Sequence, residues 1–428
     1  MNPWLSIVAL IVAPAVAAET GATSSATTPA VDLAALLDEA EMANPALRAA
    51  AERRSGAQHG PAQAESLPDP MVSLSFQNES LDSWTLGETQ MSNITMAWSQ
   101  EMPGSGKRRL AGDVARGELT VVAAAAADLR VELRSRVKAA YIELLFVDRT
   151  LAILHDNRGV LEALREVVRA RYESGGGMIE NVLRAGAEIA RLDLTIAEVA
   201  GARLRTEAAL AALLGRTGQA PFGPAREFPT VAPWDAQELE ASAVQRSTRV
   251  ARARADVALE VSRLEAARRE TKPDWRWSAG YAERGSLDSM VMGGVGFRLP
   301  LFARNKQDQA VARSRHEVEA ARLEAEDVEV RVLAELRGRV AEARTAEIQR
   351  RTLEQAVLPQ ADAAYEAALV AYQNGQADFG TAYDNFARRL EDARVLEQVR
   401  AAYLGALARL EPLAGREIVL AGDGASHE

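Results

Sequence analysis

The chain has 428 residues and a formal net charge of −10, and it contains no cysteine. Aromatic residues make up only 5% of it, which suits long helices packed through small side chains better than a thick globular core. The negative charge argues against a nucleic acid partner, and the lack of cysteine excludes disulfides, thiolate metal sites and a lipid anchor on an N-terminal cysteine.

The first residues have the pattern of an export signal. An apolar stretch from Leu5 to Ala13 is followed by Pro14 and by the small-x-small sequence Ala15-Val16-Ala17, although no Lys or Arg precedes the apolar stretch. We expect residues 1–17 to form a signal peptide rather than a buried helix. Residues 18–31, rich in Thr, Ser, Ala and Gly, are expected to form a flexible leader.

The rest of the chain is an internal duplication, because the landmarks of one half recur about 200 residues later. The matched landmarks are Pro68-Asp69 with Pro273-Asp274, Met102-Pro103 with Leu299-Pro300, Val114-Ala115-Arg116 with Val311-Ala312-Arg313, and Tyr172-Glu173-Ser174-Gly175 with Tyr372-Gln373-Asn374-Gly375. The predicted divisions are a first repeat over 32–216, a linker over 217–234, a second repeat over 235–411 and a flexible tail over 412–428.

Each repeat opens with a short amphipathic helical stretch that leads into two alternating strands. In the first repeat Val72, Leu74 and Phe76 alternate with polar residues, and Trp275 and Trp277 do so in the second. We predict β-hairpins over 70–101 and 275–300. Alternation over about ten residues is typical of a membrane β-strand, with one face for lipid and the other for a polar lumen. A half-buried sheet in a soluble protein is the alternative.

Four membrane strands cannot close a barrel, and an open edge in lipid leaves backbone groups unpaired. The chain would therefore have to pool strands with copies of itself. Two copies would give about eight strands, whose interior is filled by side chains, whereas three would give about twelve and leave room for a channel. The residues alone allow both assemblies.

A long helical hairpin follows each strand pair. The apolar spacing predicts such hairpins over 104–216 and 303–411, each with an outgoing helix of about 100 Å. They reverse at Gly175-Gly176-Gly177 and at Gly375-Gln376-Ala377. Helices of this length indicate either a conduit across the periplasm or a coiled-coil spacer.

In this order and spacing, the segments resemble the TolC-like outer membrane efflux factors over nearly the whole chain after the leader. The resemblance rests on the two Tyr-x-x-Gly turns, Leu67-Pro68-Asp69-Pro70, Ser99-Gln100-Glu101-Met102-Pro103 leading into Gly106-Lys107-Arg108, and Leu299-Pro300-Leu301-Phe302. It implies a mainly α fold with membrane β structure. The implied assembly is a homotrimer whose twelve-stranded β-barrel in the outer membrane of a Gram-negative bacterium continues into a long α-helical periplasmic barrel.

The resemblance also implies a function, that of the outer membrane channel of a tripartite efflux system. The implied partners are outer membrane lipid, a periplasmic adaptor protein and an inner membrane pump of the resistance-nodulation-division type. Segments 67–71 and 99–107 are similar to the heavy-metal branch of the family, so heavy-metal cations are the expected cargo, with drugs or organic solvents as the alternative. The alternative function is a periplasmic coiled-coil adaptor or scaffold, which usually has a single helical hairpin.

No catalytic, cofactor-binding or metal site is predicted, so we do not expect an enzyme. The four histidines lie far apart in the sequence, and no His-Glu-x-x-His motif is present. The segment Gly104-Ser105-Gly106-Lys107 lacks the first glycine of a phosphate-binding loop.

The resemblance places the functional residues at the turns of the helical hairpins. Adaptor docking is expected at Gly175, Gly177, Met178, Gly375, Gln376 and Asp378. Asn181, Thr381 and Asp384 correspond to the family's acidic ring at the closed periplasmic entrance, and only Asp384 retains a carboxylate. A ring of Asp384 side chains would bind cations. The alternatives are an ordinary solvated carboxylate at Asp384 and glycines that serve only the turns.

Overall fold

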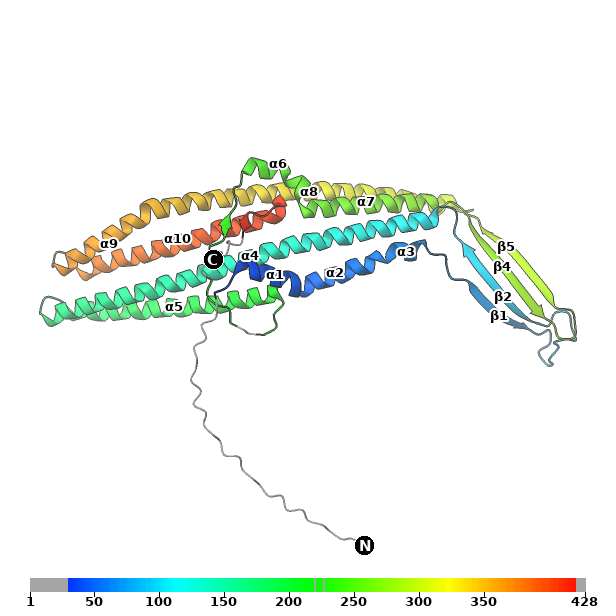
Figure 1. Ribbon diagram of the computed structural model, residues 1–428, viewed down its shortest axis with the longest axis horizontal. Coiled ribbons are helices and arrows are strands. Elements are labelled where there is room, and N and C mark those ends of the chain that lie inside the picture. The colour runs from blue at the N-terminus through cyan, green and yellow to red at the C-terminus, as the bar shows by residue number, and fades with distance from the viewer. Residues whose placement is uncertain (1–29, 219–220, 226–227, 421–428) are drawn as a thin grey trace, which may run out of the picture.

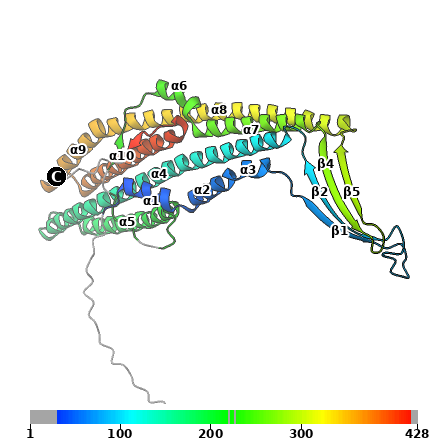
Figure 2. The same ribbon diagram turned by 45° about the vertical axis from the view of Figure 1, so that its right-hand side comes forward.

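The computed structural model describes residues 30–218, 221–225 and 228–420. The predicted signal peptide (1–17), most of the leader and the last residues of the predicted tail lie outside these ranges. The described chain is a long wall with a β-sheet at one end and the turns of two helical hairpins at the other (Figure 1). The sheet bends away from the line of the helices, as a second view shows (Figure 2).

Short helices lead into each pair of strands. They are α1 (Leu33–Ala43), α2 (Pro45–Gln58) and α3 (Gly60–Glu65) in the first repeat, and α6 (Ala236–Arg246) and α7 (Thr248–Arg269) in the second. Asp32 and Asp235 begin the two groups in the same way, because each carboxylate accepts hydrogen bonds from the backbone N–H groups two and three residues on.

The strands form one antiparallel sheet in the order β1-β2-β4-β5. Their bounds are β1 (Met71–Gln77), β2 (Asn93–Met102), β4 (Asp274–Glu283) and β5 (Met290–Arg298). The two repeats meet where β2 pairs with β4, and Ser99 lies opposite Ser278 there. Strands β1 and β5 are therefore both edges, and every residue in them is exposed.

Each strand pair is followed by a long helix and its return. In the first repeat these are α4 (Lys107–Glu173) and α5 (Ile179–Leu214). In the second, a 3₁₀ turn, η1 (Ala303–Asn305), precedes α8 (Gln307–Thr352), the π-helical turn η2 (Leu353–Val357) and α9 (Leu358–Gln373), and α10 (Phe379–Ala414) returns. Pro359 in the first turn of α9 has no N–H to donate to Gln355, so the outgoing helix is interrupted there.

Helix α4 is the central helix of the molecule, since it packs against α5, α10 and α7. Three clusters of buried side chains hold the wall together. One joins α1, α4 and α5 around Tyr141, one joins α6, α8 and α10 around Leu407, and one near the hairpin turns surrounds Phe379. Among the described residues, no helix is both long and apolar enough to cross a bilayer.

Parts of the two segments predicted to be a linker and a flexible tail are folded against the helices. Helix α10 continues through Pro412 to Ala414, and β6 (Val419–Leu420) pairs with β3 (Thr230–Val231). Ile418 and Val419 are almost fully buried. The prediction of a flexible tail from residue 412 is therefore wrong as far as residue 420.

Candidate functional site at the helical hairpin turns

Both hairpins reverse through the same backbone turn. After α4 the N–H of Gly176 donates to the carbonyl of Arg171 (2.9 Å), and after α9 the equivalent bond is donated by Gln376 (2.8 Å). Gly175 and Gly375 have φ angles of +79° and +76°, in the left-handed region that favours glycine. The turn geometry by itself therefore explains why glycine stands at these two predicted positions.

The residues that open the return helices differ between the repeats. Asp378 caps α10, since its carboxylate accepts a hydrogen bond from the backbone N–H of Thr381 (2.7 Å), and this bond holds the pKa of Asp378 below its usual range. Met178 stands at the same place before α5 without such a bond, and its side chain is 67% exposed. Gly177 is confined, because a Cβ there would lie 3.2 Å from the backbone nitrogen of Tyr172.

The three residues predicted for the entrance lie at the start of the return helices. Thr381 and Asp384 are exposed and Asn181 is half-buried. In the described chain, no hydrogen bond or ion pair joins the three side chains to one another, and Asp384 has no side-chain partner. Asp384 lies on the side of α10 opposite the buried Phe386. It therefore presents a free carboxylate close to the hairpin turns.

Arg171, which no sequence pattern singled out, joins the two turns. Its guanidinium donates to the backbone carbonyl of Tyr372 through Nη1 and to that of Gly176 through Nε (3.2 Å). It also lies over the ring of Tyr372, 5.1 Å from the centroid. Gly375 leaves room for this contact, because a Cβ there would lie 2.8 Å from Nη2 of Arg171.

A second link connects α5 to α10 farther from the turns. Tyr383 Oη donates to Glu188 Oε2 (2.5 Å), and Glu188 also pairs with Arg191. Arg184 lies over the rings of Phe379 and Tyr383, 6.0 Å and 5.9 Å from their centroids. Burial first, and then the Glu188 carboxylate, raise the pKa of Tyr383 well above its usual range. The phenol therefore keeps its proton, and the link holds across the physiological pH range.

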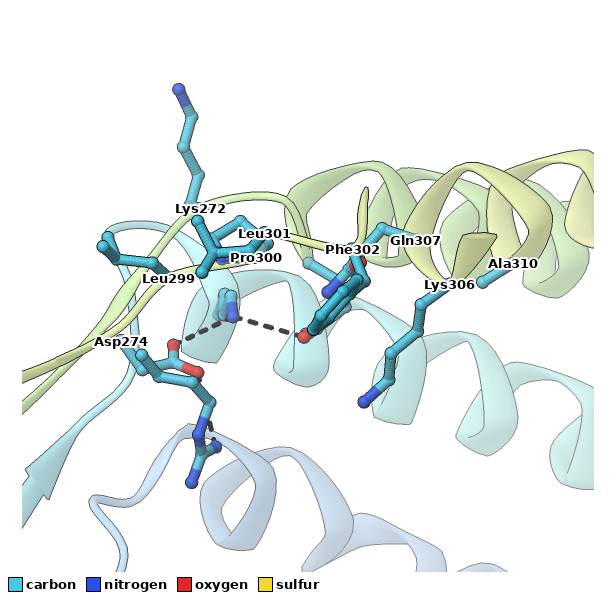
Figure 3. A pocket seen from close by; sticks show the side chains of 12 residues that line it. Lys272, Asp274, Leu299, Pro300, Leu301, Phe302, Lys306, Gln307 and Ala310 are labelled. Atoms are coloured by element: carbon cyan, nitrogen blue, oxygen red, sulfur yellow. Dashed lines mark hydrogen bonds and ion pairs between the residues drawn. The ribbon is translucent and has the colours of Figure 1, made fainter. Parts of the chain in front are cut away.

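A cavity of about 320 Å³ lies at the other end of the helices, where the sheet joins them (Figure 3). Lys107 Nζ forms one wall, 3.2 Å from Glu270 and 2.9 Å from Asp274, and Leu299 and Phe302 line another. The charged groups of the first wall, Lys107, Glu270 and Asp274, are therefore paired with each other. In the part of the chain that the structure describes, no group of three or more His, Cys, Asp or Glu side chains could hold a metal ion.

The chain is similar to known outer membrane proteins in sequence and in architecture. Residues 36–216 match a family model described as outer membrane efflux protein. A search of curated proteins found no significant match. Solved structures match almost end to end at low identity, among them VceC of Vibrio cholerae, CusC, and MtrE of Neisseria gonorrhoeae in its open state.

The structural similarity covers both repeats. VceC has 20% identity and a TM-score of 0.74, and the match covers 90% of this chain and 96% of VceC. For CusC the values are 16%, 0.77, 91% and 93%, and for MtrE 16%, 0.74, 90% and 89%. The predicted fold class is confirmed by these matches, and the proteins of the matched family are channels rather than enzymes. Residues 36–216 are thus similar to the outer membrane efflux protein family, and the chain as a whole has the fold of VceC and CusC.

Proposed function

We propose that the protein is the outer membrane channel of a tripartite efflux system, a passive exit duct from the periplasm to the exterior. The observation that carries this proposal is a four-stranded sheet with two open edges at the end of a helical wall (Figure 1). In lipid, each unpaired backbone group of an open edge costs several kcal/mol. Three copies that pool their strands form a closed barrel wide enough for a channel.

The side chains of the sheet suit this arrangement. One face carries Trp98, Tyr281 and Phe297, which are 41%, 48% and 54% exposed. The other face carries small or polar residues such as Ser73 and Gly296. An apolar face toward lipid and a polar face toward a lumen are the pattern of a membrane barrel.

The hairpin turns are the proposed docking surface for a periplasmic adaptor, and an inner membrane pump of the resistance-nodulation-division type is the proposed source of energy. Residues 1–17 would direct export as a signal peptide, and no cysteine is available for lipidation. The proposed cargo is heavy-metal cations, supported by the similarity of segments 67–71 and 99–107 to the heavy-metal branch. The pump selects the cargo, so the duct needs no metal site of its own.

The oligomeric mass tests the proposal. Protein extracted from outer membranes in mild detergent is expected to have the mass of three chains by light scattering corrected for bound detergent. A monomer or dimer in the soluble periplasmic fraction would instead favour a coiled-coil adaptor or scaffold. The cargo is tested by deleting the gene: greater sensitivity to copper, zinc or cadmium is expected, whereas sensitivity to drugs alone would reassign the cargo.

A further inference from the structure

We infer that the cavity where the sheet joins the helices (Figure 3) binds a phospholipid with an anionic headgroup, whose phosphate contacts Lys306 and whose acyl chains contact Leu301 and Phe302. This inference rests on the proposed channel, in which the sheet crosses the membrane and the helices lie in the periplasm. The junction of the two then lies at the level of the headgroups of the periplasmic leaflet.

More positive than negative side chains line this cavity. The cations are Lys107, Lys272, Arg298 and Lys306, and the anions are Glu270 and Asp274. Both anions pair with Lys107, and Arg298 pairs with Glu101. Among the residues that the structure describes, the ammonium groups of Lys272 and Lys306 have no ion pair and no hydrogen bond. The cavity therefore offers free positive charge to an anionic group.

An exposed apolar segment, residues 299–302, lies between these two lysines. Leu301 and Phe302 line the cavity and are 80% and 77% exposed. Figure 3 shows the side chains of Lys272 and Lys306 extending in opposite directions from this segment. Apolar side chains beside free cations match a lipid at the membrane surface, where acyl chains meet charged phosphates.

The apolar segment continues the apolar face of the sheet. Leu299 follows Phe297 by two residues, so the alternation of a strand places the two side chains on the same side. Phe297 belongs to the face that we propose contacts lipid. The cavity therefore lies where an acyl chain that follows this face would reach its headgroup.

The first repeat has the same junction without these features. Aligned by Val114-Ala115-Arg116 and Val311-Ala312-Arg313, the corresponding positions are Gly104 with Leu301, Ser105 with Phe302, Arg109 with Lys306, and Asp113 with Ala310. Arg109 pairs with Asp113, four residues on (2.7 Å). Lys306 has Ala310 at that place, so its charge is left free. Separate differences thus give the second repeat both an apolar surface and a free cation.

The counterpart of Leu301 also distinguishes a lipid from a second copy of the chain. Gly104 lies against the start of β4, where its N–H donates to the carboxylate of Asp274 (2.8 Å). A Cβ on Gly104 would lie 2.7 Å from the carbonyl oxygen of Pro273, so this close approach requires glycine. Leu301 has a side chain at the corresponding place. A neighbouring copy therefore cannot approach it as closely, which leaves room for an acyl chain.

Native mass spectrometry of the channel in mild detergent tests the site. Phosphatidylglycerol is the probe, phosphatidylcholine is the lipid without net charge, and inorganic phosphate is the competitor. The channel is expected to retain phosphatidylglycerol in preference to phosphatidylcholine, and excess inorganic phosphate should not displace it. Lys306→Gln should bind phosphatidylglycerol about fivefold more weakly, the factor expected for one lysine near an anionic surface, with phosphatidylcholine unaffected.

The duplication supplies matched variants at exposed positions. Arg109→Gln removes the aligned cation of the first repeat and should leave lipid binding unchanged, because Asp113 already neutralises that charge. Ala310→Asp copies Asp113 into the second repeat and gives Lys306 a partner four residues on. It should weaken phosphatidylglycerol binding about as much as Lys306→Gln does. Phe302→Ser copies the first repeat and should weaken the binding of both lipids.

Photo-crosslinking identifies what covers the segment in the membrane. With p-benzoylphenylalanine in place of Phe302, attachment to phospholipid is expected. Attachment to a second copy of the chain would overturn the inference, as would full displacement of the lipid by inorganic phosphate. Equal binding of phosphatidylglycerol by the unmodified channel, Lys306→Gln and Ala310→Asp would overturn it too. These results leave the proposed channel in place, whereas the mass of a single chain in mild detergent would overturn the channel and the lipid site with it.

Discussion

Lys138 and Glu411 form an ion pair deep between α4 and α10. Lys138 Nζ lies 2.9 Å from one carboxylate oxygen and 3.0 Å from the other, and the two side chains are 1% and 5% exposed. The same carboxylate accepts hydrogen bonds from the backbone N–H groups of Ile418 (2.8 Å) and Val419 (2.7 Å). One buried residue therefore ties the first repeat, the second repeat and β6 together.

Replacing Lys138 with Met should lower the free energy of unfolding by about 3–5 kcal/mol, because it leaves the Glu411 carboxylate buried without its cation. Denaturant unfolding followed by circular dichroism measures the loss. Arg136→Met on the same helix is the control, since Arg136 pairs with Glu132 at the surface and is 64% exposed. Its loss should be about 0.5 kcal/mol or less. Equal losses in the two variants would show that the buried pair has no special role.

The effect of Lys138→Met should also depend on pH. Burial raises the pKa of Glu411, and the charge of Lys138 opposes that rise. A carboxyl with a higher pKa in the folded state contributes stability that is full below its unfolded pKa and is lost as pH rises through its folded pKa. Without Lys138 the pKa rises further, so the destabilisation should be smaller at about pH 5 than at about pH 8. A loss independent of pH would mean that Glu411 keeps its charge in the variant.

The repeat and its element types could be predicted because they depend on local patterns. The alternation at Trp275 and Trp277, for example, specifies a strand without knowledge of its neighbours. The folded end of the chain could not be predicted in this way. Pro412 and the glycines that follow are typical of a flexible chain end. The backbone N–H of Val419 is instead bound by the carboxylate of Glu411, which is paired with Lys138, 273 residues earlier in the chain.

The candidate site also contains some features that could be predicted from local sequence and others that could not. The turn glycines were predictable from local sequence, but the contacts of Arg171 with Tyr372 and of Tyr383 with Glu188 join residues 201 and 195 positions apart. Such contacts depend on how the two hairpins lie side by side. One signal was available, since Phe379, Tyr383 and Phe386 recur at helical spacing on one face of α10.

Alanine at the two turn glycines should have unequal effects. Both substitutions force a side chain into the left-handed region at a cost of about 1 kcal/mol, but Gly175 has open space around it, whereas a Cβ at Gly375 would displace Arg171. Gly375→Ala should therefore increase hydrogen exchange in both turns more than Gly175→Ala does. Combining each with Arg171→Ala should remove the difference; a difference that persists would assign it to the turn alone.

The exposed side chain of Met178 offers a test of adaptor docking that avoids backbone strain. Met178→Glu adds a charge to a surface that we propose is covered by the adaptor, so efflux should fall severalfold while the oligomeric mass stays the same. Met42→Glu is the control, since Met42 is 79% exposed on α1, far from the turns. Unchanged efflux in Met178→Glu would place the docking surface elsewhere.

Asp384 decides whether the entrance selects for charge. In a closed assembly every copy contributes one of these carboxylates, and a ring of them attracts cations and repels anions. Asp384→Asn should therefore lower the cation preference measured in planar bilayers. The difference should be larger at about 0.1 M salt than at 1 M, where charges more than about 3 Å apart are screened. Asp392→Asn, about 12 Å farther along α10, is the control. If both variants keep the original selectivity, Asp384 is an ordinary solvated carboxylate and the entrance selects by width alone.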